Sequence, residues 1–266
     1  MSRNLSRLLR PRSIVVIGGG AWCAQIVRQS RAMNFAGRID VIHPRSEVIE
    51  GVQSISSFSS LAHVPDAVFV GVNRIASIEI IRQLSEMGAG GAVCFASGFS
   101  EAAAEDGRGT DLQAALVEAA GNMTVLGPNC YGFINALDGA LLWPDQHGCT
   151  RVESGVAILT QSSNIAINLS MQLGGLPIAY VVACGNMAQT TQAQIACELL
   201  DDPRVTAIGL HIEGFGDLAD WHALASKAYE KGVPLIALKV GRSDQAQQAA
   251  ISHTASLAGS DAGAAA

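Results

Sequence analysis

Short, continuous runs of β-branched and other apolar residues recur along the chain, separated by segments with helical periodicity. Because the runs are apolar at successive rather than alternate positions, they predict strands buried on both faces. We expect nine strands, at 14–17, 39–42, 67–72, 92–96, 123–126, 156–160, 180–183, 207–212 and 235–240. We expect helices between them at 24–33, 75–87, 111–119, 165–173, 191–200 and 218–231.

The alternation of strands and helices indicates βαβ units and parallel sheets, an α/β fold. Nine strands would make a wide single sheet, and the segment Leu137–Glu153 has Gly, Pro and polar residues without a clear period. We therefore expect two doubly wound parallel-sheet domains, at 1–140 and 150–266.

Composition narrows the class of protein. Of 266 residues, 49% are hydrophobic and 15% charged, which is enough for a large core, and the net charge of −6 argues against a nucleic-acid or anionic membrane surface. The six cysteines show no CxxC or CxxH spacing, so we expect reduced thiols in a cytoplasmic protein and no metal site. No apolar run approaches the 18 residues of a membrane-spanning helix.

The two ends of the chain are distinctive. Four arginines and no acid precede Ser13, and we expect a short basic helix there rather than a transit peptide because a strand begins at once. The segment Ser252–Ala266 is rich in Ala and Gly and stops without a capping element. It fits a disordered tail or the first turn of a longer helix, and we expect the chain to be a fragment or a separated domain.

Ligands of open α/β sheets bind at the carboxyl ends of the strands. Gly18, Gly19 and Gly20 follow the first strand, where glycine lets the backbone approach a phosphate at a helix N-terminus. The dinucleotide fingerprint is incomplete, since Cys23 occupies the place of its third glycine. A tight turn without a ligand is the alternative.

The second strand ends in a basic sequence that contains Pro44 and Arg45, where an NAD site usually carries an acid. A cation there fits the phosphorylated ribose of NADP or of coenzyme A, and a solvated arginine is the alternative. The other strand ends of the first half also carry polar or small residues. These candidate cofactor residues are Asn73, Arg74, Ser97, Gly98, Phe99 and Asn129.

In the second half, Gln161, Ser162 and Ser163 follow one strand, and Gly185 and Asn186 follow the next. Each turn is expected to lead into a helix, so two helix N-termini could hold one phosphoryl group between them. The alternative is that these residues are helix caps only.

Two residues are candidates for the chemistry itself. Glu213 ends an apolar strand, and His253 lies between the hydroxyl residues Ser252 and Thr254. A carboxylate could fix the tautomer of the imidazole and raise its nucleophilicity. A lone histidine is more often structural than catalytic.

These motifs, in this order, resemble those of the NDP-forming acyl-CoA synthetases, relatives of the succinyl-CoA synthetase α subunit. The resemblance covers nearly the whole chain, and its most specific stretches are GPNCYGFIN at 127–135 and SHTASLAG at 252–259. It also includes HPR at 43–45, SGF at 97–99, TQSSN at 160–164, GN at 185–186, DDPRV at 201–205 and IEG at 212–214.

The resemblance implies a Rossmann-like CoA-binding domain followed by a flavodoxin-like ligase domain with a phosphohistidine loop. It implies that ATP and Mg²⁺ bind an ATP-grasp domain or subunit outside this chain, and that the phosphoryl group passes through His253, assisted by Glu213, to a small carboxylic acid. Coenzyme A then attacks the acyl phosphate, a mixed anhydride with a good leaving group. A homo- or hetero-oligomer is expected.

The chain departs from the family pattern at two turns. The pattern SQSG is replaced by Gln161-Ser162-Ser163-Asn164, and the acids of GNE-D are replaced by Met187 and Gln189, which indicates a different carboxylic acid. The segment Trp143-Pro144-Asp145 could shape the acyl pocket or pack the domain interface.

Two other functions fit parts of the pattern. An NADP-dependent reductase would use the glycine turn and the basic strand end, but the third glycine and a Tyr-x-x-x-Lys pair are absent. A non-catalytic CoA-binding regulatory protein would need neither Glu213 nor His253.

Overall fold

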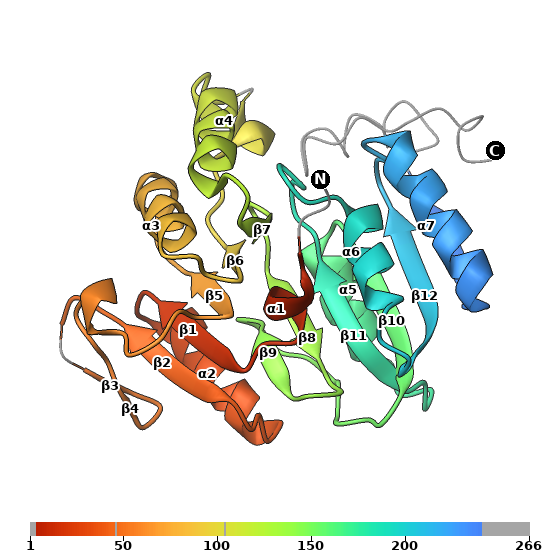
Figure 1. The fold of residues 1–266 in the computed structure, drawn as a ribbon, viewed down its shortest axis with the longest axis horizontal. Helices are drawn as coiled ribbons and strands as arrows, with labels where there is room; N and C mark the ends of the chain where they lie inside the picture. Colours follow the sequence, from red (N-terminus) through yellow and green to blue (C-terminus); the bar gives the residue numbers. More distant parts are fainter. Residues whose placement is uncertain (1–3, 46, 104, 241–266) are drawn as a thin grey trace.

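The computed structural model describes residues 4–45, 47–103 and 105–240, and it contains every strand and helix that the hydrophobic pattern predicts (Figure 1). Element ends differ from the expected ones by a few residues. The basic N-terminal segment contains the short helix α1 (Ser6–Leu9). No helix in the described ranges is long and apolar enough to cross a bilayer.

The first sheet is parallel throughout, in the order β2-β1-β5-β6-β7. Its strands are β1 (Ser13–Ile17), β2 (Arg38–Ile42), β5 (Ala67–Val70), β6 (Gly91–Cys94) and β7 (Thr124–Leu126). Strand order reverses between β1 and β5, which creates the topological switch point where ligands of such sheets bind.

Helices cover both faces of this sheet because alternate residues of each strand point to opposite sides. Ile14 and Val16 pack on the side of α2 (Ala21–Ala32), whereas Val15 and Ile17 pack on the side of the other two helices. Those helices are α3 (Arg74–Glu86) and α4 (Gly109–Ala120). The expected continuous apolar strands therefore follow from burial on both faces.

The second sheet is mixed, in the order β13-β12-β10-β11-β8-β9, whereas a parallel sheet is expected from the sequence. Its parallel strands are β10 (Gly155–Thr160), β11 (Ile178–Ala183), β12 (Val205–Ile212) and β13 (Leu235–Lys239). Strands β8 (Gly132–Asn135) and β9 (Ala140–Leu142) form an antiparallel hairpin, and β8 pairs antiparallel with β11.

The hairpin explains the mixed sheet. Its two strands are too close in sequence to be joined by the crossover that parallel pairing needs, so they pair antiparallel. Residues 132–142 thus lie by hydrogen bonding in the second sheet, although most of them precede the expected boundary at 140–150.

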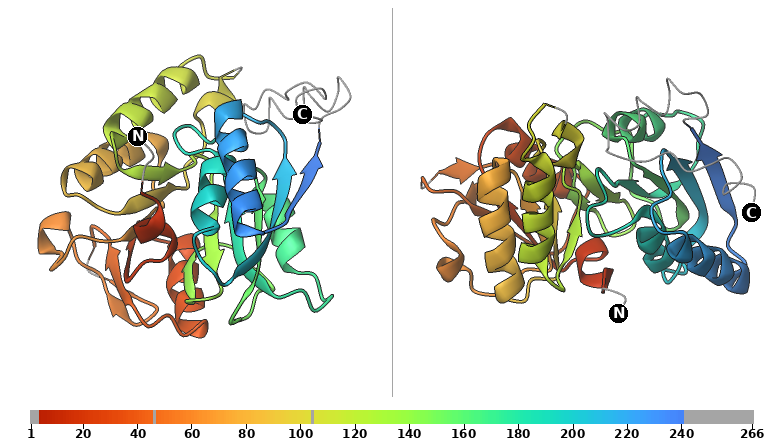
Figure 2. Two further views of the ribbon diagram at one scale, coloured as in Figure 1. Left: turned by 45° about the vertical axis from the view of Figure 1, so that its right-hand side comes forward. Right: turned by 90° about the horizontal axis from the view of Figure 1, so that it is seen from above.

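Helices also cover the two faces of the second sheet (Figure 2). Helix α5 (Ser163–Ser170) packs on one face, and α6 (Gln192–Leu199) and α7 (Leu218–Lys231) pack on the other. Edge strand β13 departs from the expected burial on both faces, since Ile236 and Leu238 are 60% and 62% exposed. These two side chains point to the face of the sheet on which α5 packs. Helix α5 contacts strands β10 and β11 there, at some distance from β13 along the sheet.

The smaller elements lie at the rim. Strands β3 (Val48–Ile49) and β4 (Val52–Gln53) form a hairpin, and short 3₁₀ helices span Phe58–Ser60 and Ser100–Ala102. The two sheets share one apolar core, and polar contacts tie the N-terminal segment to the second domain. The Nδ2 group of Asn135 donates to the carbonyl of Leu9 at 2.9 Å, and Arg10 pairs with Glu198 at 2.7 Å.

Candidate functional site

The glycine turn lies at the switch point of the first sheet, and two of its glycines are required by packing. The amide of Gly18 donates to the carbonyl of Ile42 at 3.1 Å, and a Cβ at this position would stand 2.6 Å from the carbonyl oxygen of Gly71. A Cβ at Gly19 would stand 2.6 Å from Nε2 of His43. His43, which the sequence analysis includes only within the HPR motif and not among the candidate cofactor residues, is therefore a further site residue, since its ring packs against the turn.

Gly20 is different, because a Cβ there would meet no described atom within 4 Å. Its φ of 84° lies in the region that favours glycine. No side chain of the described residues caps the N-terminus of α2, whereas Asn73, Ser162, Thr191 and Asp217 cap α3, α5, α6 and α7. The first amides of α2 thus receive no side-chain cap from the described part of the chain and lie at the positive end of a twelve-residue helix, an arrangement that binds anions.

Asn73 and Arg74, across the switch point, are engaged with protein groups. The Oδ1 atom of Asn73 accepts hydrogen bonds from the amides of Ile75 and Ala76 at 3.1 and 3.0 Å, so its side chain is a helix cap. The guanidinium of Arg74 donates to the carbonyl of Gly98 and pairs with Asp106. These two side chains shape the turn rather than offering free groups to a ligand.

Glu101 occupies the amides of the third predicted turn. Its Oε1 atom accepts hydrogen bonds from the amides of Gly98 at 2.6 Å and Phe99 at 3.3 Å, and its Oε2 atom accepts one from Asn186 of the second domain. The sequence analysis missed this residue. Its signal is an acid three residues after a glycine, where a carboxylate can fold back onto the preceding amides. Ser97 is exposed beside the turn.

We expect Glu101→Ala to lower the stability of the chain by about 2 kcal/mol, because it leaves two amides and Asn186 without their charged acceptor. For a chain of this size that corresponds to a fall in melting temperature of about 5 °C. Glu105→Ala is the matched control, since Glu105 is exposed. Equal melting temperatures for the two variants would contradict this role.

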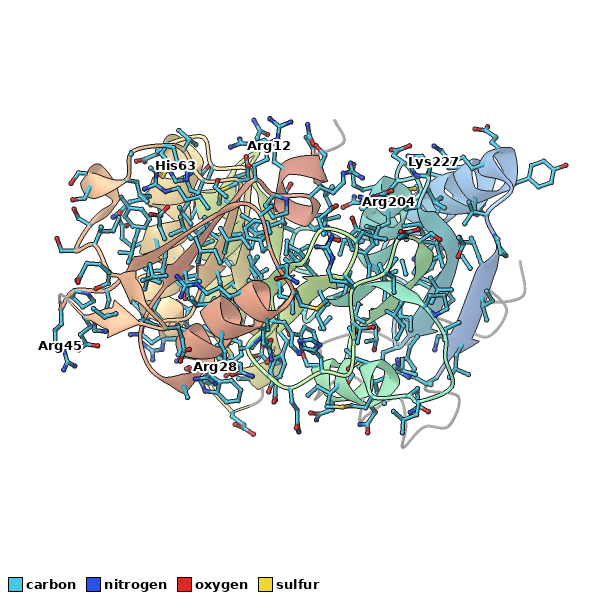
Figure 3. The ribbon with its side chains drawn as sticks, turned by 90° about the horizontal axis from the view of Figure 1, so that it is seen from below. Arg12, Arg28, Arg45, His63, Arg204 and Lys227 are labelled. Carbon is cyan, nitrogen blue, oxygen red and sulfur yellow. The ribbon has the colours of Figure 1, made fainter. Side chains whose placement is uncertain are left out.

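The basic strand end lies at the rim of the first domain. Arg45 is 81% exposed and points into solvent, with its nearest acid, Glu47, at 3.8 Å (Figure 3). Pro44 is also exposed. The Nδ1 atom of His43 lies 3.1 Å from the carbonyl of Arg45 and holds the turn in place.

The structure brings the fifth turn of the first domain against the second domain. The amide of Asn186 donates to the carbonyl of Pro128 at 3.0 Å, and Nδ2 of Asn129 donates to Oδ1 of Asn186 at 3.4 Å. A Cβ at Gly185 would stand 2.6 Å from the carbonyl oxygen of Asn129, so only glycine permits this approach. A predicted cofactor residue and two predicted phosphate residues therefore meet at one point.

Cys130 lies directly behind this contact and is a structural thiol. Its Sγ donates to the carbonyl of Ala183 at 2.8 Å, and burial raises its pKa to about 12. A thiol with that pKa is not a nucleophile at neutral pH.

The side chains of Gln161 and Ser162 also form hydrogen bonds with groups of the protein itself. The Oε1 atom of Gln161 accepts from the amides of Glu213 and Gly214 at 2.6 and 2.9 Å, and its Nε2 donates to the carbonyl of Gly214 at 2.7 Å. Ser162 caps α5, and Ser163 is the first residue of that helix. Gln161 thus fixes the turn that carries Glu213.

The helix expected at 191–200 after this turn is α6, which begins at Gln192 and is closed by a capping box on Thr191, so residues 187–191 lie between Asn186 and the helix. Only the N-terminus of α5 follows its strand closely. The intervening loop docks on the first domain instead, because Gln189 accepts from the amide of Val125 and donates to two carbonyls of that domain. Gln189 therefore serves as a tether between the domains.

Glu213 lies at the end of β12 and is only 6% exposed. His211, two residues earlier, places Nδ1 3.3 Å from the hydroxyl of Thr160, and burial lowers its pKa while the Glu213 carboxylate opposes that shift. His253 lies outside the described residues. No cluster of acids, histidines and cysteines within the described ranges could hold a metal ion.

Comparison with known proteins assigns both domains. A family model described as a CoA binding domain matches residues 12–136, and one described as a succinyl-CoA ligase like flavodoxin domain matches residues 153–266. The α subunit of acetate–CoA ligase (ADP-forming) I from Pyrococcus furiosus is 31% identical over 273 residues, which are 97% of this chain and 57% of the relative. The chain belongs to the ADP-forming acyl-CoA synthetase family.

Two further members of the family extend the comparison. Trans-feruloyl-CoA synthase FCS1 from an unidentified prokaryote is 30% identical over 97% of this chain and 38% of its own length. A dinucleotide-forming acetyl-coenzyme A synthetase 1 from Ca. Korarchaeum cryptofilum, solved in an apo form and with phosphate and ADP, is 27% identical with a TM-score of 0.84. The matched part is 97% of this chain and 56% of that protein.

These matches confirm the family and the CoA-binding domain that the sequence motifs indicate. The chain spans between about two fifths and three fifths of the relatives it matches.

Proposed function

We propose that this chain forms the coenzyme- and phosphoryl-handling part of an ADP-forming acid–CoA ligase. The observation that carries the proposal is the contact between Asn129 of the CoA-binding domain and Asn186 of the ligase domain. This contact brings the turn after β7 of the first sheet next to the turn after β11 of the second. The thiol of a coenzyme A bound at the strand ends of the first sheet would therefore lie close to the phosphate turn of the ligase domain.

Coenzyme A is proposed to lay its diphosphate over Gly20 and the free amides of α2. The open space at Gly20 and the uncapped helix end fit such a group. Arg45, at the next strand end toward the sheet edge, is proposed to meet the 3′-phosphate. The thiol end would then run the other way, toward the junction with the second domain.

His253 is proposed to carry the phosphoryl group from ATP to the acid. ATP and Mg²⁺ would bind an ATP-grasp domain or subunit beyond the described residues, and no residue of the described part is assigned to them. Glu213, buried at the end of β12 and fixed by Gln161, is suited to orient one imidazole nitrogen and leave the other free to attack. The amides at the N-terminus of α5 would stabilise the transferring charge.

The placement of coenzyme A is tested by charge reversal at Arg45. We expect Arg45→Glu to weaken CoA binding about tenfold at low ionic strength and dephospho-CoA binding much less, because only the former carries the 3′-phosphate. Isothermal titration calorimetry with both ligands measures the difference.

Arg12→Glu is the matched control for that experiment. Arg12 is also exposed, but it immediately precedes β1 and so lies at the amino ends of the strands, whereas Arg45 follows a strand at its carboxyl end (Figure 3). Equal losses for CoA and dephospho-CoA in Arg45→Glu, or a similar loss in the control, would contradict the placement of the 3′-phosphate.

A further inference from the structure

Trp22 is a largely exposed aromatic residue in the first turn of α2, two residues after Gly20. It is 45% exposed, and within the described ranges Tyr229 on α7 is the other aromatic residue with so much free surface. The two residues differ in their surroundings. Trp22 contacts two other rings, whereas Tyr229 contacts no ring of the described part of the chain.

Two half-buried rings hold the indole of Trp22 in place. The ring centroid of Trp22 lies 5.6 Å from that of Phe95 and 6.2 Å from that of Tyr131, and the latter two are 5.6 Å apart. Phe95 packs in turn on the buried ring of Phe69, at 5.5 Å. Because the indole is already oriented, a ligand that covers its free surface immobilises little additional side-chain motion.

The two supporting rings show on which side of the helix end the indole lies. Phe95 directly follows β6, and Tyr131 follows β7. In the sheet order β2-β1-β5-β6-β7, both rings lie on the far side of β1 from β2. Arg45 follows β2 and lies in the opposite direction. The N-terminus of α2 therefore has a cation on one flank and an apolar ring on the other.

Coenzyme A carries matching groups on the two sides of its diphosphate. One side bears the adenosine with its 3′-phosphate, and the other bears the pantetheine arm. The arm begins with a carbon that holds two methyl groups, and a single methylene separates this dimethyl unit from the diphosphate. Once the diphosphate is bound at the helix end, the dimethyl unit has to lie beside it. With the 3′-phosphate toward Arg45, the dimethyl unit falls on the flank of Trp22.

We propose that Trp22 binds the dimethyl unit at the start of the pantetheine arm, and that this contact makes the site prefer coenzyme A over nucleotides that lack pantetheine. The inference rests on the proposed function, because it uses the placement of the diphosphate and of the 3′-phosphate. The attraction comes from removing the apolar surfaces of the indole and of the two methyl groups from water. A nucleotide without pantetheine leaves the free surface of Trp22 exposed.

The nucleotide half of the coenzyme, adenosine 3′-phosphate 5′-diphosphate, separates this contact from the others. We would measure its affinity and that of coenzyme A for this chain by calorimetry. Trp22→Ala should weaken the binding of coenzyme A about tenfold and leave that of the nucleotide half within about twofold, because only coenzyme A has apolar groups to bury on the ring. Arg45→Glu should weaken both ligands alike, since both carry the 3′-phosphate. Tyr229→Leu, which removes an exposed ring remote from α2, should change neither affinity.

Tryptophan fluorescence gives a second measurement that needs no destabilising substitution. Coenzyme A should shift the emission of the unchanged chain to shorter wavelength, the nucleotide half should not, and Trp22→Phe should abolish the shift although Trp143 and Trp221 remain.

An unchanged affinity for coenzyme A in Trp22→Ala would overturn the proposal. So would an equal loss for both ligands, since the ring would then contact adenine or support only the helix end. If the unchanged chain binds neither ligand, the proposed function fails instead, and the two failures are thereby distinguished.

Discussion

Replacing His253 with alanine should abolish phosphorylation of the chain by ATP in the complete enzyme, with a loss of about 10³-fold or more. The physical reason is that the hydroxyls of Ser162 and Ser163, the other nucleophilic groups at the proposed phosphate turn, are weak nucleophiles unless a base activates them, whereas a neutral imidazole attacks directly. The thiol of Cys130 is held protonated there, because burial raises its pKa to about 12. Transfer of label from γ-labelled ATP measures the effect, and a phosphohistidine is recognised because it is labile in acid and stable in base.

The control is the affinity for coenzyme A, which His253→Ala should leave within about threefold, or roughly 0.7 kcal/mol. An acid-labile label that persists in the variant, or an unchanged turnover rate, would show that His253 performs no chemistry. A chain that binds coenzyme A but accepts no label, even before the substitution, would support a regulatory protein instead.

Ala21→Glu should weaken coenzyme A binding by about 100-fold while leaving the fold intact or slightly more stable. Ala21 is exposed and is the first residue of α2, whose first turn holds no acid. A carboxylate there favours the helix dipole and stabilises the helix by about 0.3–1 kcal/mol. The same carboxylate would stand beside the proposed diphosphate, where repulsion at 4–6 Å amounts to a few kcal/mol.

Ala21→Glu is expected to lower the affinity for coenzyme A and to leave the melting temperature unchanged or slightly raised, and this combination makes the experiment specific. Ala21→Gln is the matched control, because glutamine has the same shape without the charge and should retain most of the affinity. Calorimetry measures binding, and thermal melting measures stability. Unchanged affinity in Ala21→Glu would exclude the N-terminus of α2 as the diphosphate site, and a lowered melting temperature would attribute any loss of binding to damage to the helix.

Much of the fold is predictable from local pattern. The strands and helices are predicted from apolar runs and helical periods among residues that are neighbours in sequence. The pattern is local because side chains on the same face recur every two residues in a strand and about every 3.6 residues in a helix. The glycine turn is equally local. A Cβ at Gly18 or Gly19 would clash with neighbouring atoms, and Gly20 has a positive φ. The backbone conformation of this turn therefore requires glycine, and that requirement is visible in the sequence.

The hairpin β8–β9 and the edge strand β13 show where local pattern stops. Residues 132–142 look like the end of one domain, but hydrogen bonding to β11 makes them part of the other sheet. The apolar run of β13 predicts burial, yet Ile236 and Leu238 are largely exposed. Both outcomes depend on which strand lies alongside, and that partner is distant in sequence.

By itself, the sequence determined the family, the order of the elements and the turns where ligands are to be sought. Only the tertiary structure decided which polar groups of those turns are already occupied: Asn73 caps a helix, Gln161 fixes the turn of Glu213, and Glu101 fills the amides of Gly98 and Phe99. A motif records which groups are present. Hydrogen bonding is a competition among all the groups within about 3 Å of each other, and folding brings those groups together from distant parts of the chain.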